Sequence, residues 1–313
     1  MLNFFRRRFS RLCLFLSLIV MALLFGCKPA KVTPIIFRVM TFNIHHGEGV
    51  DGKVDLDRIA NVILEANADA VALQEVDRNT RRTGGVDMIK ELGKRTNMHF
   101  AFGSNLDFQG GEYGTAILSK HPIQSFENHA LKQVRDGEPR GVLQAVLDVG
   151  QGQILFVSTH LDHTKDQAER LFSQSQFDDL FAKYKDLPAI FCGDFNDTPD
   201  SELYKRMSEK WVDSWSLAGK GDGFTMTSSM PSRRIDYVWV SDKKNFTMRW
   251  VDVPMTKASD HLPLIAEMEM KPVPHPMGSE QLALLIIVLT FLSAIPIGLG
   301  ITIFKANQSS KSI

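Results

Sequence analysis

The stretch Lys257-Ala258-Ser259-Asp260-His261-Leu262-Pro263 places a carboxylate and an imidazole side by side, directly before an apolar alternating run. Four further polar clusters precede it, each at the end of a strand-like run: Thr41-Phe42-Asn43, Leu73-Gln74-Glu75-Val76, Ser158-Thr159-His160-Leu161-Asp162 and Gly193-Asp194-Phe195-Asn196-Asp197. Strand ends are where sandwich and α/β folds gather catalytic side chains. The set therefore predicts one metal-dependent site that hydrolyses phosphoesters.

The composition is that of an ordinary folded protein. The 313 residues are 44% hydrophobic with a formal net charge of +0, which suits one or two domains with a sizeable core. A neutral balance gives no general support for nucleic-acid binding, since proteins that bind the phosphate backbone usually carry a basic face. A local basic groove is not excluded. Cys13 and Cys27 lie in the N-terminal leader, so Cys192 alone is left in the domain and no disulfide framework is expected.

The N-terminal segment is predicted to be an export signal. Basic residues from Arg6 to Arg11 precede an apolar run over residues 12–25, which ends in Leu24-Phe25-Gly26-Cys27. This end resembles a bacterial lipobox, so residues 1–27 are interpreted as a signal peptide with lipidation at Cys27. An uncleaved signal anchor with an incidental cysteine is the alternative.

The C-terminal segment is predicted to cross a membrane. Residues 282–304 contain no charged side chain, and about 20 apolar residues suffice for a spanning helix. A Pro-containing linker over 272–281 precedes this helix, and a tail over 305–313 follows it. Basic residues at both ends place both ends in the cytoplasm and the middle outside. We therefore expect a membrane-anchored protein in a bacterial cell envelope, held at the inner membrane, with an extracytoplasmic catalytic domain.

The middle of the chain, residues 35–271, is predicted to form one domain with many short strands and a few helices. Strands are expected over residues 35–41, 70–73, 115–118, 141–149, 153–158, 188–192, 235–240 and 262–268. Helices are expected over 88–95 and 164–183, and after Asp55, where apolar residues recur three and four apart. This pattern predicts an α/β fold with a two-sheet core and helices on the outside.

Phosphoester hydrolysis at neutral pH needs a hard cation, a base for water and stabilisation of the leaving oxygen. Hard cations prefer oxygen ligands, so Glu75 is the first choice as a metal ligand. Asn43 offers an amide oxygen to the metal or a donor to the phosphate. Asp194 could orient or deprotonate water, and Asn196 could donate a hydrogen bond to phosphate. The alternative for this last pair is an ordinary Asx turn before a helix at Ser201.

Two histidines are candidates for acid–base roles. His160 and His261 each have an aspartate within two residues, Asp162 and Asp260. Asp260 would either orient the imidazole of His261 or complete a metal site. Asp236 enters an apolar strand, where an acid is costly without a partner, and His160 or His261 is the expected partner.

Over residues 37–270, these motifs resemble the endonuclease/exonuclease/phosphatase superfamily of metal-dependent phosphohydrolases. The segments that carry the resemblance are Thr41-Phe42-Asn43, Gln74-Glu75-Val76, Gly193-Asp194-Phe195-Asn196, Arg234-Ile235-Asp236-Tyr237 and Ser259-Asp260-His261. The resemblance implies a four-layer α/β sandwich of two packed, mainly antiparallel sheets flanked by helices, with Mg²⁺ or Mn²⁺ as cofactor.

The resemblance also implies roles for single residues. Asn43, Glu75 and Asp260 would surround the metal, and Asp194 and Asn196 would contact phosphate and water. Asp236 would support the His160 region, while His261 would act as catalytic base or phosphate ligand. Thr115 stands where family members often have Asn, which leaves its role open. Arg140 is a candidate phosphate-binding cation, with a plain surface arginine as the alternative.

Superfamily membership does not decide the substrate, because members act on DNA, inositol phosphates and sphingomyelin. An extracytoplasmic, membrane-held domain with only Arg81 and Arg82 as a tight basic pair favours a lipid or small-molecule phosphodiester. An extracytoplasmic nuclease acting on DNA is the second hypothesis. A non-catalytic membrane-tethered binding module is the third, and intact candidate residues disfavour it. The oligomeric state is left open.

Overall fold

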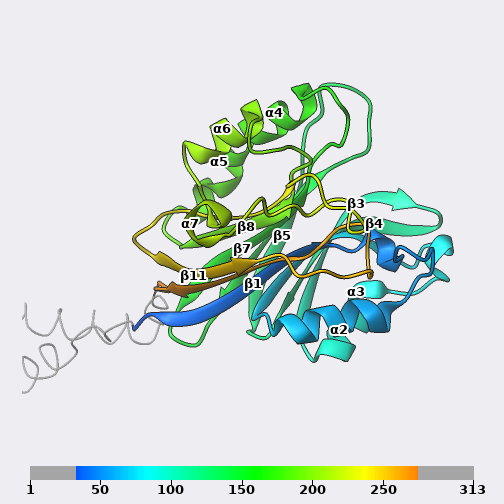
Figure 1. Ribbon diagram of the computed structural model, residues 1–313, viewed down its shortest axis with the longest axis horizontal. Helices are drawn as coiled ribbons and strands as arrows, with labels where there is room; N and C mark the ends of the chain where they lie inside the picture. The colour runs from blue at the N-terminus through cyan, green and yellow to red at the C-terminus, as the bar shows by residue number, and fades with distance from the viewer. Residues whose placement is uncertain (1–32, 274–313) are drawn as a thin grey trace, which may run out of the picture. The chain divides into compact units, whose positions relative to one another are not determined.

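Two six-stranded sheets form the core of the computed structural model, which describes residues 33–273 (Figure 1). The first sheet has the order β11-β12-β1-β2-β4-β3, with β1 Ile35–Asn43, β2 Ala70–Arg78, β3 His99–Phe108, β4 Gly111–Ser119, β11 Phe246–Asp252 and β12 Leu264–Met270. The second has the order β5-β6-β7-β8-β10-β9, with β5 Ile123–Ala130, β6 Gly141–Asp148, β7 Gln153–His160, β8 Ala189–Asp194, β9 Val212–Asp213 and β10 Asp236–Val240.

The sheets share one pattern of strand directions. In each, a central parallel pair, β1–β2 or β7–β8, is flanked by antiparallel neighbours on both sides. The sheets were expected to be mainly antiparallel. They are mixed, because each contains one parallel pair among its antiparallel neighbours. The two parallel pairs matter for function because strands that run the same way deliver their carboxyl ends to one edge.

Helices cover the outer face of each sheet and complete four layers (Figure 1). Helices α2 Leu56–Ala66 and α3 Met88–Thr96 pack on the first sheet. On the second lie α4 Ala168–Ser175, α5 Phe177–Phe181 and α6 Glu202–Ser208. The short α7 Ser214–Ala218 follows β9 and packs Trp215 and Ala218 against the core between the sheets. As expected, Asp55 caps the N-terminus of α2. Its carboxylate accepts a hydrogen bond from the Arg58 backbone N–H at 3.0 Å.

Polar contacts join the two sheets where their parallel pairs end. Gln74 donates through Nε2 to Ser158 Oγ at 3.2 Å, and Ser158 donates to the Leu73 carbonyl at 3.3 Å. All three residues are fully buried. Elsewhere the sheets meet through apolar side chains such as Phe156 and Leu264. The carboxyl ends of β1, β2, β7 and β8 are thereby fixed together, and the candidate catalytic residues Asn43, Glu75, His160 and Asp194 lie at or near them.

The expectation of one long helix over residues 164–183 is wrong. The chain instead forms α4, α5 and a short 3₁₀ helix, η3 Ala182–Tyr184. Before α4, aspartate side chains accept hydrogen bonds from the backbone two residues on, as Asp162 does from Thr164 N and Asp166 from Ala168 N. Such local bonds compete with helix formation, so amphipathic spacing did not suffice.

Several expected features of the chain fall outside the described residues. These are the leader over 1–27 with its Cys27, most of the linker over 272–281, the spanning segment over 282–304 and the tail over 305–313. Across residues 33–273, no helix combines the length and apolar character needed to span a bilayer.

Candidate active site

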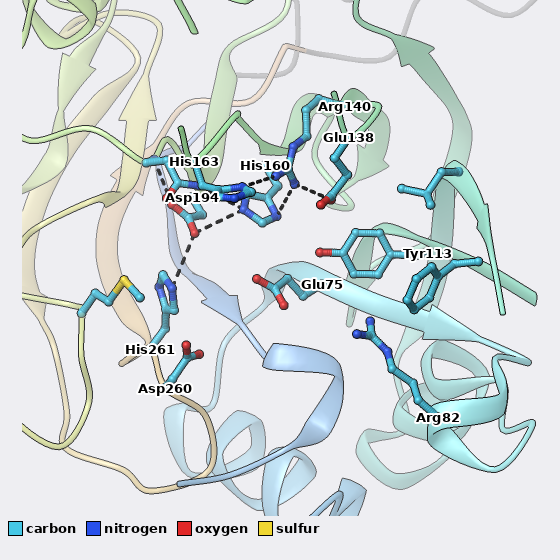
Figure 2. Close-up of a pocket in the computed structure, with 14 residues that line it drawn as sticks. Glu75, Arg82, Tyr113, Glu138, Arg140, His160, His163, Asp194, Asp260 and His261 are labelled. Carbon is cyan, nitrogen blue, oxygen red and sulfur yellow. Dashed lines mark hydrogen bonds and ion pairs between the residues drawn. The ribbon is translucent and has the colours of Figure 1, made fainter. Parts of the chain in front are cut away.

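Six residues predicted from the sequence line one cavity of about 470 Å³ at the carboxyl ends of the parallel strand pairs (Figure 2). They are Glu75, His160, Asp194, Asn196, Asp260 and His261. Arg140 lines the same cavity, whereas Asn43 and Asp236 lie buried behind its wall. The separate polar clusters of the sequence therefore form a single site.

Asp194, the last residue of β8, lies at the centre of this site. Its Oδ2 accepts a hydrogen bond from Asn43 Nδ2 at 3.1 Å and lies 3.5 Å from His160 Nε2 and 3.6 Å from His261 Nε2. Its Oδ1 accepts from the backbone N–H of Asn196 at 2.9 Å. Burial and the charge of Asp236 together raise the pKa of Asp194 to about 7. This carboxylate can therefore exchange a proton near neutral pH.

The partner of Asp236 is His261. Asp236 pairs with Asp194 across β10 and β8, and its Oδ2 lies 2.9 Å from His261 Nδ1. Burial by itself would lower the pKa of His261, but the charges of Asp236 and Asp194 outweigh it and raise this pKa to about 10. His261 is accordingly an imidazolium at neutral pH. The expectation that Asp236 supports His160 is wrong, because the register of β10 aims its carboxylate at His261.

Arg140 determines the tautomer of His160. Arg140 is only 4% exposed and its Nη1 lies 3.0 Å from His160 Nδ1. Because a guanidinium can only donate, Nδ1 accepts, and the proton of the neutral ring lies on Nε2. Nε2 is 3.5 Å from Asp194 Oδ2 and 3.1 Å from Nδ2 of Asn196, which donates to the Leu161 carbonyl. Burial and the charge of Arg140 hold the pKa of His160 well below its ordinary value. His160 therefore stays neutral and orients Asp194, and Arg140 is not a surface arginine.

The carboxylate of Glu75 reaches the cavity through an irregularity in β2. The pairing of β2 with β4 shifts register between Leu73 and Val76, and Glu75 has a left-handed backbone with φ of 57°. Such a bulge turns a side chain away from the regular alternation. Asn43 Nδ2 donates to Glu75 Oε1 at 3.0 Å, while Asn43 Oδ1 accepts from His45 N at 3.1 Å. Asn43 thus bridges two carboxylates as a donor.

Ser259 couples the Asp260–His261 loop to the first strand. Its hydroxyl donates to the Asn43 carbonyl at 2.7 Å and accepts from the backbone N–H of His261 at 3.2 Å. The loop is also held by the Ser228 backbone N–H, which donates to the Asp260 carbonyl at 2.6 Å. Asp260 keeps a partly exposed side chain at the cavity. This anchoring fixes an acid and an imidazole on the same side of the site.

The donor set at the cavity fits a hard divalent cation. Glu75 and Asp260 both present carboxylate oxygens to it, and oxygen donors are what such cations prefer. His45 was not foreseen from the sequence, and its Nδ1 lies 3.9 Å from Asp260 Oδ1. His45, His46 and Glu75 each offer one ligand atom within 4.8 Å of the others. Of the three predicted ligands, Glu75 and Asp260 are the residues that would hold the ion, with His45 beside them. The amide oxygen of Asn43, the third, accepts from the backbone N–H of His45 instead.

Other cavity residues carried no pattern that sequence reasoning could detect. Tyr113 and Phe108 come from the β3–β4 hairpin, and His163 lies in the loop after β7. Arg82 was noted only as half of a basic pair. Thr115 does not line the cavity; it is buried within β4 and its hydroxyl has no hydrogen-bond partner among the described residues.

This four-layer sandwich holds a buried acid–imidazole pair, an arginine that orients a histidine, and carboxylates suited to a cation. Together these features define a class of metal-dependent phosphoester hydrolases. Comparison with known proteins supports this class. The chain belongs to the Endonuclease/Exonuclease/phosphatase family, whose model matches residues 40–261. It is a metal-dependent phosphoric ester hydrolase.

Individual relatives are distant. YbhP of Escherichia coli (strain K12), an uncharacterized protein, is 26% identical over 258 residues, covering 77% of this chain and 100% of that protein. A 5'-tyrosyl-DNA phosphodiesterase of Caenorhabditis elegans is 26% identical over 200 residues, covering 58% of this chain and 48% of that protein. The crystal structure of an endonuclease/exonuclease/phosphatase from Beutenbergia cavernae matches with a TM-score of 0.64 and 26% identity, covering 75% and 72% of the two chains.

The Asp236–His261 pair generates a pH prediction for the metal-free protein. NMR titration should place the pKa of His261 near 10, and Asp236→Asn should lower it because the neighbouring negative charge is gone. Since the folded-state pKa lies above the ordinary value of 6.5, the pair stabilises the fold fully below about pH 6.5 and loses this contribution as pH rises through about 10.

The unfolding free energies of wild type and Asp236→Asn should therefore differ more at about pH 6 than at about pH 10. Denaturant titration at both pH values measures this difference. An equal difference at both, or an unchanged His261 pKa in the variant, would contradict the assigned pairing.

Proposed function

We propose that this enzyme is a phosphodiesterase that acts on a lipid or small-molecule phosphodiester outside the cytoplasm, with Mg²⁺ or Mn²⁺ as its cofactor. The observation that carries the proposal is the convergence of Glu75, Asp194, Asn196, Asp260 and His261 on one cavity. Its volume of about 470 Å³ is within the usual range for small-molecule sites. Apolar side chains of Leu106 and Phe108 share the lining, which suits a compact organic group.

Each residue then has a role that follows from its charge and position. Asp194, with its pKa near neutrality, accepts a proton from the attacking water. His261 stays protonated and donates to a phosphate oxygen, so of the two roles foreseen for it we favour phosphate ligand over base. Asn196 and the Arg140–His160 pair hold Asp194 and the phosphate in place. A cation bound by Glu75 and Asp260 would offset phosphate charge and polarise the ester.

A nuclease acting on DNA is the second candidate. It is favoured by one observation, the similarity to the Caenorhabditis elegans protein named a 5'-tyrosyl-DNA phosphodiesterase. Against it stand the neutral overall charge and the pairing of cavity arginines with carboxylates, as in Arg82–Asp77 and Arg140–Glu138. Among the residues that the structure describes, the cavity lining contains only these two arginines and no lysine, too few for the extended basic groove that a DNA backbone requires. A purely binding role is disfavoured because every catalytic group predicted for the family is present in this chain.

Hydrolysis should require a divalent cation, because Glu75 and Asp260 are suited to bind one and repel phosphate without it. Chelation should abolish turnover of a nitrophenyl phosphodiester, and titration with Mg²⁺ or Mn²⁺ should restore it. Glu75→Gln should weaken binding of the ion in calorimetry as well as lower the rate. Full turnover in excess chelator would refute metal dependence.

Asp194→Asn should lower kcat on the order of 10²–10⁴-fold, as loss of a proton-transfer group typically does. His261→Gln should lower kcat on the order of 10²–10³-fold, as loss of one donor to developing charge on the phosphate does. Asp179→Asn in α5 and His99→Gln in β3, both exposed positions away from the cavity, serve as matched controls. Circular dichroism confirms folding. If both site variants turn over at the wild-type rate while folded, the assigned roles are incorrect.

The location outside the cytoplasm is proposed from the sequence of the chain ends. Cys27→Ala should leave the protein in the inner membrane, held by residues 282–304. Deletion of residues 275–313, which keeps the backbone pairing of Val273 with Gln153, should leave a lipid-anchored form. Deleting both anchors should release soluble enzyme. Protease added to spheroplasts should digest the domain, and protection from it would overturn the proposed topology.

A further inference from the structure

One side of the cavity carries hydrogen-bond donors that the proposed reaction does not use. Glu75 lies between the two sides, with His261 and Asp260 on one and Tyr113 and Arg82 on the other (Figure 2). The side with Tyr113 and Arg82 contains no residue that we place at the scissile phosphate.

Arg82 is held in a fixed orientation. Its Nε and Nη2 donate to the two oxygens of Asp77, each at 2.7 Å. Asp77 is fully buried and also accepts from the Thr80 hydroxyl at 2.5 Å. The guanidinium lies 4.7 Å from the ring centroid of Phe108 and 5.5 Å from that of Tyr113. A guanidinium fixed in this way needs little further ordering when a ligand binds.

The remaining nitrogen of Arg82 is a donor for that ligand. Nη1 makes no hydrogen bond to any residue in the part of the chain that the structure describes. The guanidinium points into the cavity toward Glu75 and Tyr113 (Figure 2). Asp77 offsets its charge, so the site offers a directional donor rather than a free positive charge.

Tyr113 supplies a second donor. Burial, together with the charges of Glu75 and Glu138, raises the pKa of its phenol, so the hydroxyl keeps its proton. The hydroxyl points into the cavity (Figure 2), and it makes no hydrogen bond to any residue within 33–273. A protonated phenol and a guanidinium side by side favour an acidic acceptor group.

The carboxylates that face this region do not prevent an anion from binding. Glu138 pairs with Arg140 Nη1 at 2.9 Å. Glu75 accepts from Asn43 and faces the cation that the proposed function requires. Each acid thus has a positive or donating neighbour, whereas Tyr113 O–H and Arg82 Nη1 lack acceptors among the described residues.

We propose that Arg82 and Tyr113 form a subsite for a second acidic group of the substrate, a carboxylate or a phosphate carried beside the phosphoester that is cleaved. This inference rests on the proposed function and narrows its substrate class to small phosphoesters with two anionic groups. A neutral alcohol or a plain acyl chain would leave both donors without an acceptor, which is costly once they are desolvated.

Binding tests the subsite without any turnover. With excess Mg²⁺ present, calorimetry compares propylphosphonate with 3-phosphonopropionate and with propane-1,3-bisphosphonate, which add a carboxylate or a second phosphonate. Hydrogen bonds to a charged group predict at least about tenfold tighter binding of one or both doubly acidic compounds. The two arms distinguish a carboxylate from a phosphate as the group bound.

Tyr113→Phe and Arg82→Lys should remove this preference while leaving the affinity for propylphosphonate within about twofold. Lysine is chosen because it keeps a cation for the buried Asp77. Tyr184→Phe and Arg249→Lys, both outside the cavity lining, are the matched controls and should keep the preference. Thermal unfolding of each variant shows that the fold is retained.

Hydrolysis gives an independent readout. The enzyme should cleave 2-carboxyethyl nitrophenyl phosphate with a higher kcat/KM than ethyl nitrophenyl phosphate, and Tyr113→Phe should equalise the two. Equal binding of all three phosphonates, or a preference that survives both variants, would overturn the subsite and leave the hydrolase intact. Absence of hydrolysis with either ester would refute the proposed function, while the calorimetry would still decide the subsite.

Discussion

The site is organised around a buried negative charge, the carboxylate of Asp194 at the end of β8. A carboxylate removed from water is costly unless other groups bind it, and here Asn43, Asn196, His160 and His261 surround it. These groups come from both sheets and from the loop before β12. The same contacts that stabilise the charge therefore hold the two halves of the sandwich in a catalytic arrangement.

Neighbouring charges give the two histidines opposite protonation states. His160 faces Arg140 and stays neutral, so it can orient Asp194 without competing for its proton. His261 lies between Asp236 and Asp194 and keeps its proton well above neutral pH. One imidazole thus acts as a neutral positioning group and the other as a cation for phosphate, although both are buried.

Prediction from the sequence succeeded for the central strands and failed at the edges. Of the strands that the structure describes, β3, β5, β9 and β11 were not foreseen, and each of them is an edge strand of its sheet. Edge strands are partly exposed, as in β5, so they lack the apolar runs that mark a central strand such as β8. The helix expected over 164–183 failed for a different reason, since aspartate side chains such as Asp162 bind the backbone locally.

The sequence by itself determined the family, the two-sheet core and half of the cavity lining, because residues such as Glu75, Asp194 and His261 lie beside strands whose pattern is visible locally. It could not decide which histidine pairs with Asp236, since that depends on the register between β10 and β8. Nor could it foresee His45 beside Asp260, or the donors of Arg82 and Tyr113 on the opposite side of Glu75. Those pairings join residues far apart in the chain, so only the tertiary structure brings them together. His261 and Asp236 meet where the two sheets pack, whereas the other pairs come from neighbouring segments of the first sheet.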